Sequence, residues 1–193
     1  MVFLKERLCQ LLRSIGIIVI SGWLIIGPNH AVASLAPNKQ EKSKKVQQLI
    51  KSNNRFLTDD EAESIANAHI AASEKYGIDL TTGLAISFKE STFYPSATSK
   101  DGISVGLMMV NKRVWKSALQ LDMTKLQSID YNVDVGYKIL RIYVDKYGYS
   151  TGIRRYRGSV HDSTNNKYFN AIQTLKSKFE KWLVFDPEPA GSV

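Results

Sequence analysis

The sequence has very few of the residues that bind metals or form disulfides. Among its 193 residues the single cysteine is Cys9, and the only histidines are His30, His69 and His161. A disulfide within the chain needs two cysteines, and zinc sites take at least three side-chain ligands, most often cysteine and histidine. We therefore expect no disulfide and no metal site.

Long hydrophobic runs are almost absent as well, with one exception close to the N-terminus. Residues 15–26 form an apolar run that is shorter than the roughly 20 residues of a transmembrane helix. Basic residues precede the run (Lys5, Arg7 and Arg13), and the small-x-small sequence Ala31-Val32-Ala33 follows it. This pattern predicts a secretory signal peptide over residues 1–33 that is cleaved after Ala33, with a retained membrane anchor as the alternative.

Cleavage after Ala33 would give an exported protein, periplasmic or secreted, that lacks Cys9. A cysteine nucleophile is then excluded. The cleaved segment carries three basic residues and one acidic residue, so the net charge falls from +8 to +6. A positive exported protein favours anionic partners such as cell-wall polymer, lipid headgroups or extracellular DNA. The charge alone does not distinguish these partners from a surface that is basic for solubility.

The rest of the composition is typical of one soluble globular domain. Hydrophobic residues make up 44% of the chain and charged residues 23%, and no internal repeat is visible. Residues 34–56 are rich in Lys, Gln, Asn and Ser, which predicts a flexible N-terminal arm. We expect residues 57–184 to form the folded domain and residues 185–193 to be a disordered tail.

Helical signals dominate residues 57–184. Thr58 and Glu61 match a capping box, which predicts a helix that ends before Gly77. Asp79 is a candidate N-cap for a helix over residues 80–90. Apolar spacing predicts further helices over residues 112–121, 132–147, 152–156 and 167–183, with a loop over residues 91–110. The predicted fold class is therefore mainly α.

Glu90 lies in the last turn of the helix predicted over residues 80–90. The negative end of the helix dipole disfavours a carboxylate there, and burial would raise its pKa in the same direction. A carboxyl group that keeps its proton in this way can act as a general acid. On the residues alone, the simpler interpretation of a solvated glutamate at a helix end stays open.

Glu90 also begins an ordered series of motifs. The first part of the series comprises Glu90, Ser91, Phe93, Pro95, Ala97, Ser99, Gly102, Gly106, Leu107 and Met108. The later part comprises Asn132, Gly136, the segment Tyr156-Arg157-Gly158-Ser159 and the helix that starts near Tyr168. Over residues 75–180 the sequence thereby resembles the SLT-type lytic transglycosylases, whose pattern E-S-x-F-x-P-x-A-x-S and G-L-M-Q it follows almost letter by letter. The resemblance implies a single lysozyme-like catalytic domain of the goose-lysozyme/SLT type.

The resemblance also implies an activity. Such enzymes cleave the β-1,4 bond between N-acetylmuramic acid and N-acetylglucosamine in peptidoglycan without a metal or organic cofactor, and they leave 1,6-anhydro ends. Glu90 is implied to act first as the acid and then as the base. The expected substrate-binding residues are Ser99, Met108, Met109 and Tyr156, with the Tyr156 phenol facing Glu90 and hydrogen-bonding its carboxyl group.

Two other functions stay open, and the second of them is motivated by two departures from the family pattern. Met109 stands where the family has a glutamine that is implied to contact sugar, and Arg157 stands where it has asparagine. One alternative is a hydrolytic muramidase, in which Asp101 would assist a water molecule. The other is a catalytically weakened cell-wall-binding assembly factor.

The expected partners follow from these functions. They are peptidoglycan glycan strands and an envelope-spanning secretion or conjugation machine. Nucleic acid is not expected, because the basic cluster Arg154, Arg155 and Arg157 lacks a repeated base-stacking pattern and the predicted export gives the protein no intracellular location. Nothing in the sequence requires more than a monomer.

Overall fold

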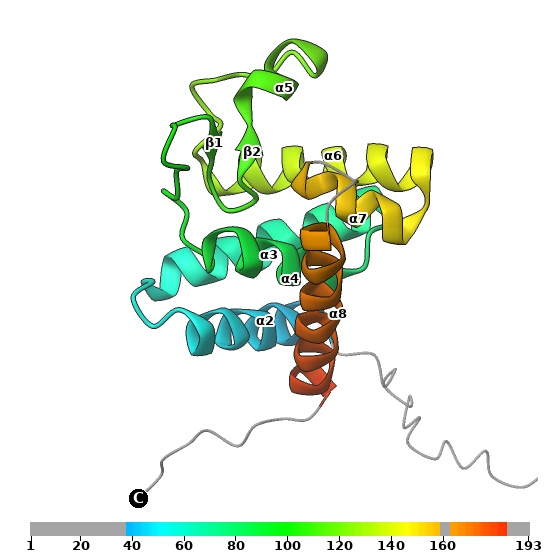
Figure 1. Cartoon of the computed structure of the whole chain (residues 1–193). Coiled ribbons are helices and arrows are strands. Elements are labelled where there is room, and N and C mark those ends of the chain that lie inside the picture. Colours follow the sequence, from blue (N-terminus) through cyan, green and yellow to red (C-terminus); the bar gives the residue numbers. More distant parts are fainter. Residues whose placement is uncertain (1–37, 159–162, 185–193) are drawn as a thin grey trace, which may run out of the picture. The chain divides into compact units, whose positions relative to one another are not determined.

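The computed structural model describes residues 38–158 and 163–184 (Figure 1). The elements within these ranges are α2 (Lys39–Asn53), α3 (Asp59–Tyr76), α4 (Leu80–Ser91), β1 (Ser104–Val105), β2 (Val110–Asn111), α5 (Lys112–Ala118), α6 (Ile129–Tyr147), α7 (Tyr149–Arg157) and α8 (Ser163–Val184). The predicted mainly α fold is confirmed. The predicted signal peptide (1–33) and tail (185–193) lie outside the described residues. No helix in the described ranges has both the length and the apolar composition to cross a bilayer.

Helices α3 and α4 begin at the capping residues that the sequence predicts. The Thr58 side chain accepts from the Glu61 amide at 3.1 Å, and the Glu61 carboxylate accepts from the Thr58 amide at 2.8 Å. The left-handed conformation of Gly77, with φ 60°, ends α3. Asp79 then caps α4 by accepting from the Thr82 amide at 2.9 Å. The end of α3 at Gly77 and the Asp79 cap together fix the start of α4, the helix that carries Glu90.

Helix α2 corrects the prediction of a flexible arm over residues 34–56. From Lys39 onward the segment is helical, and it packs against α3 and α8. Its three buried side chains, Val46, Leu49 and Ile50, belong to the hydrophobic core. Their spacing of three and one residues gives a narrow apolar stripe on an otherwise polar helix. The stripe is too short to predict a helix alone, and tertiary packing stabilises it.

A buried asparagine of α6 holds the antiparallel β1–β2 hairpin. The Asn132 carboxamide oxygen accepts from the Met108 amide at 2.8 Å, and its nitrogen donates to the carbonyls of Val105 and Leu126 at 2.9 and 2.8 Å. An added Cβ at Gly106 would overlap Asn132. The loop predicted over residues 91–110 therefore contains a hairpin whose position α6 determines.

Helix α8 packs against α4 (Figure 1), and its Tyr168 hydroxyl reaches Glu90 in the last turn of α4. Phe179 of α8 contacts Phe88 and Phe93, with ring centroids 6.0 and 6.4 Å apart. Aromatic pairs at such distances add about 0.5–1.5 kcal/mol beyond the burial of area. This packing selects which side chains of α8 lie beside Glu90.

Candidate active site

Glu90 lies in the last turn of α4, and its side chain is half-buried. Desolvation raises the pKa of Glu90, while the hydrogen bond from Tyr168 and the positive charges of Arg157 and Lys89 oppose part of the rise. The carboxyl group therefore keeps its proton to a higher pH than an ordinary glutamate. This property suits a general acid.

Tyr168 is the side chain that holds the Glu90 carboxyl group. Its hydroxyl donates to Glu90 Oε1 over 2.6 Å. Tyr168 belongs to α8 and is 3% exposed, and burial raises its pKa well above the usual value, so the phenol remains a donor. The Arg157 guanidinium lies 5.5 Å from the centre of the Tyr168 ring. The carboxyl group is thus oriented by a rigid phenol with a cation beside it.

Tyr156 does not make the hydrogen bond that the sequence predicts for it. Its hydroxyl donates to the Met108 backbone carbonyl over 2.7 Å. Burial is the main cause of the raised pKa of Tyr156, and the charge of Glu90 is the second, so the two groups are still neighbours. Tyr156 and Tyr168 come from different helices, and the packing of α8 on α4 decides that Tyr168 reaches the carboxyl group. The sequence feature that could have identified the partner of Glu90 is Tyr168 itself, the tyrosine at the end of the family resemblance.

The chain reverses direction immediately after α4. Thr92 and Phe93 both have positive φ angles, 54° and 59°, although neither is glycine. Such conformations cost of order 1–3 kcal/mol each and persist where the surroundings enforce them. Full burial of the Phe93 ring and the hydrogen bond from the Thr92 amide to the Phe88 carbonyl, at 2.8 Å, enforce them here. Glu90 is therefore placed at the edge of a tight turn and not within a continuing helix.

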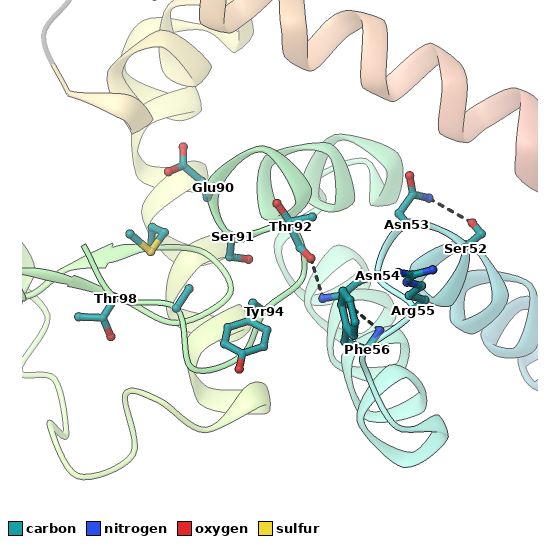
Figure 2. Close-up of a pocket in the computed structure, with 12 residues that line it drawn as sticks. Ser52, Asn53, Asn54, Arg55, Phe56, Glu90, Ser91, Thr92, Tyr94 and Thr98 are labelled. Atoms are coloured by element: carbon teal, nitrogen blue, oxygen red, sulfur yellow. Dashed lines mark hydrogen bonds between the residues drawn. The ribbon is translucent and has the colours of Figure 1, made fainter. Parts of the chain in front are cut away.

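Two cavities meet at Glu90. The larger, of about 720 Å³, lies between the α2–α3 loop and the turn after α4, and Figure 2 shows its lining. The smaller, of about 180 Å³, lies among the hairpin, α5 and α7. Glu90 and Met109 line both cavities. We refer to the two cavities together as the groove, because they share Glu90 and Met109, and a chain-like substrate would need space on more than one side of the acid.

The two adjacent methionines have different environments. Met109 lines both cavities and has a positive φ of 45°, which turns its side chain toward the groove. Met108 is fully buried against Gly136 of α6, so the prediction that Met108 binds substrate is wrong. Its backbone carbonyl, which accepts from Tyr156, still supports the wall of the groove. Among the two, only Met109 can touch a ligand.

Ser99 lines the smaller cavity but is engaged with its own turn. Its hydroxyl donates to the Asp101 carboxylate over 2.5 Å and accepts from the Ser104 amide at 2.9 Å. The Ser99 hydrogen bond is the main cause of the lowered pKa of Asp101, with the Ile103 amide next. Asp101 is therefore ionised and exposed, and it lines neither Glu90 cavity. Its position favours the structural role in the turn over activation of water.

Aromatic and basic side chains line the groove on both sides of Glu90. Phe56 and Tyr94 in the larger cavity are 81% and 53% exposed. In the smaller cavity, Trp115 and Tyr143 meet edge to face with centroids 5.6 Å apart. The basic residues that line the groove are Arg55, Arg155 and Arg157. Flat rings and cations are suited to a carbohydrate that carries negative charges.

Chemically, this arrangement can protonate a bond that lies across the groove. Among the described residues that line the two cavities, Glu90 is the only carboxylic acid. Within the same part of the chain, no cluster of three or more His, Cys, Asp or Glu residues could hold a metal ion. A single carboxyl group that alternates between acid and base is the chemistry that these residues support best.

The family model described as the transglycosylase SLT domain matches residues 67–169. This segment begins within α3 and ends within α8, so it includes Glu90, Met109, Tyr156 and Tyr168, whereas α2 and the α2–α3 loop precede it. No curated protein matches the chain.

Proposed function

The chain belongs to the family of SLT transglycosylase domains, and we propose that it cleaves the β-1,4 bond between N-acetylmuramic acid and N-acetylglucosamine in peptidoglycan, leaving 1,6-anhydro ends. The observation that carries this proposal is the position of Glu90. Its carboxyl group lies where two cavities meet, it has a raised pKa, and Tyr168 orients it.

In the first step, Glu90 acts as the acid. The glycan strand lies across the groove with the scissile oxygen at the carboxyl group. Tyr168 donates to Oε1, which leaves Oε2 as the oxygen that carries the proton. Transfer of this proton to the bridging oxygen breaks the bond to C1 of the muramic acid, and an oxocarbenium-like centre develops.

In the second step, Glu90 acts as the base. The carboxylate takes the proton from the C6 hydroxyl of the same muramic acid residue, and the C6 oxygen bonds to C1. The 1,6-anhydro ring forms, Glu90 is protonated again, and no water is consumed. The hydrogen bond from Tyr168 stabilises the carboxylate between the two steps, because charge-assisted hydrogen bonds are stronger than neutral ones.

Hydrolysis by water is the competing reaction. An inverting glycosidase needs a second carboxylate as base, and a retaining glycosidase needs one as nucleophile. Glu90 is the only carboxylic acid among the described residues lining the groove, and Asp101 is held in its turn. These observations favour attack by the internal C6 hydroxyl.

The site of action follows from the predicted leader. With residues 1–33 as a signal peptide, the protein would reach the periplasm or the exterior, where peptidoglycan is accessible. Local opening of the wall for an envelope-spanning secretion or conjugation machine is the use that we propose for such a small domain.

Mass analysis of digested sacculi tests the reaction. The proposal predicts muropeptides with anhydro ends, about 18 Da lighter than their hydrolytic counterparts. Products with only hydrated reducing ends would instead identify a muramidase.

A second candidate is a wall-binding assembly factor with weakened catalysis. The favouring observation is that Met109 and Arg157, the two departures from the family pattern, both line the groove at Glu90. A purified protein that binds sacculi but releases the same amount of product as Glu90→Gln would support this candidate. A clear excess of product over Glu90→Gln would exclude it.

A further inference from the structure

The α2–α3 loop, residues 52–56, forms one wall of the larger cavity and precedes the segment that matches the family model. We propose that this wall binds the anionic peptide stem of the glycan strand, with Arg55 contacting a stem carboxylate and Phe56 covering an apolar face of the same muropeptide. The inference rests on the proposed function, since it assumes that the strand lies at Glu90.

Asn54 fixes the loop relative to the active site. It is 8% exposed, its side-chain nitrogen donates to the Thr92 carbonyl at 3.0 Å, and its side-chain oxygen accepts from the Phe56 amide at 3.1 Å (Figure 2). Thr92 follows Glu90 by two residues. The wall is therefore tied to the turn that positions the acid, and little ordering is needed when a ligand binds.

Lys51 holds the loop from its other side. Its amino group donates to the Leu57 carbonyl at 2.8 Å and pairs with Asp59 at 2.9 Å. The loop is thus anchored on both flanks of Arg55 and Phe56, although both of these side chains are exposed. A rigid backbone with exposed arginine and phenylalanine side chains is typical of a binding surface and not of a solvated linker.

The charge of the cavity favours an anionic ligand. Among the described residues of the lining, Arg55 is the only base and Glu90 the only carboxylic acid, and burial raises the pKa of Glu90. The Arg55 guanidinium lies 5.2 Å from the centre of the Phe56 ring, and within the described ranges it forms no ion pair with a carboxylate. A carboxylate of the ligand can approach this cation, which the aromatic ring already orients.

The geometry of the substrate selects the peptide stem over other anions. The stem branches from C3 of muramic acid, the sugar whose C1 is at Glu90, so it must leave the groove close to the acid. The larger cavity includes Glu90 and extends to Arg55, and its volume of about 720 Å³ exceeds the need of one sugar ring. Stem peptides end in free carboxylates, and these match the positive charge of Arg55 in the wall of the cavity.

The test compares sacculi with intact stems and glycan strands from which an amidase has removed the stems. Wild-type protein is expected to cleave the intact material at a higher kcat/KM. Arg55→Gln should reduce this preference by about threefold to fivefold, the range of an exposed charge contact, and Arg55→Lys should restore part of it. Lys138→Gln, which removes an equal charge from an exposed position on α6, should have no effect on the preference.

Binding measurements separate this inference from the proposed function, because they need no turnover. In the Glu90→Gln background, Arg55→Gln should weaken binding to intact sacculi, measured by pelleting, and leave binding to the released stem-free strands, measured by titration calorimetry, unchanged. If no variant cleaves but this difference in binding remains, the proposed function fails and the stem site stands. If Arg55→Gln changes neither the cleavage preference nor the binding difference, the stem site is wrong, whatever the enzyme activity. Equal losses on both substrates would also overturn it, and would assign Arg55 to the sugar backbone.

Discussion

Two titratable side chains of this protein are each held by a tyrosine hydroxyl, and their surroundings differ. His69 of α3 is fully buried, with Nδ1 3.1 Å from the Tyr137 hydroxyl. Glu90 of α4 is half-buried and accepts from Tyr168. Desolvation lowers the pKa of His69 to about 3 and raises the pKa of Glu90, so the interior favours the neutral form of both groups.

The difference between the two pairs is access. The ring of His69 lies in the core, it lines neither Glu90 cavity, and its Nε2 has no hydrogen-bond partner among the described residues. Glu90 lines both of these cavities. A perturbed pKa alone therefore does not identify a catalytic group, and the candidate is the perturbed group that also lies where two cavities meet. The His69–Tyr137 pair should affect stability, and the Glu90–Tyr168 pair should affect turnover.

The largest expected effect is that of Glu90→Gln on turnover. Loss of the proton donor should reduce the rate of muropeptide release by about 10²- to 10⁴-fold. The glutamine oxygen can still accept from Tyr168, so the fold should be retained, and thermal unfolding with circular dichroism checks this. Full activity of Glu90→Gln would show that the Glu90–Tyr168 pair has no role in turnover.

The structural pair is tested by Gly83→Ala. Gly83 of α4 packs against the Tyr137 hydroxyl, and an added methyl group would overlap it. Displacement of the buried tyrosine should lower the free energy of unfolding by about 1–3 kcal/mol, as overpacking does in other cores. Urea unfolding measures the loss, and kcat of the folded fraction should stay near the wild-type value. A normal stability would show that Tyr137 is not tightly held.

Tyr168→Phe should change the pH dependence of turnover. The first step needs protonated Glu90, so activity falls as the pH rises through its pKa. The Tyr168 hydrogen bond lowers that pKa, and its removal should move the basic limb of the kcat profile to higher pH, with a rate loss of about tenfold. Tyr156→Phe is the matched control, because that hydroxyl donates to a backbone carbonyl and the limb should stay in place. Equal shifts in both variants would contradict the assignment of Tyr168.

His69 should make a smaller contribution, visible in stability against pH. Its pKa in the folded state, about 3, lies below the unfolded value of 6.5. The unfolded chain therefore binds the proton first, and the stabilisation present above pH 6.5 is lost as the pH falls toward 3. From about pH 7.5 to 5.5 the loss should be about 1 kcal/mol. His69→Phe, or His69→Gln if that variant is too unstable, should remove this part of the slope, and an unchanged slope would contradict a buried neutral histidine.

The parts of the fold with strong local signals were predictable. The capping box of α3, the stop at Gly77 and the Asp79 cap locate α3 and α4, and hence the helical end on which Glu90 lies. Helix α2 was not predictable as part of the domain, because its three buried apolar residues need α3 and α8 to stabilise them. For the same reason, the sequence did not predict that the folded domain begins before residue 57 or that Arg55 lines the larger cavity.

The site was predictable where the motif is local and not where it depends on packing. Glu90 and Met109 line the groove, as the motif indicates. The choice between Met108 and Met109 depends on a backbone angle at Met109, and the choice between Tyr156 and Tyr168 depends on how α7 and α8 pack. Neither is encoded in residue spacing.

The central claim is that Glu90 directs an internal attack without water, and digestion of sacculi in water enriched with heavy oxygen tests it most directly. Wild-type protein should release anhydro-ended muropeptides that contain no heavy oxygen from the solvent, and Glu90→Gln should release almost none. Heavy oxygen at the newly formed ends, or equal release by Glu90→Gln, would contradict the account.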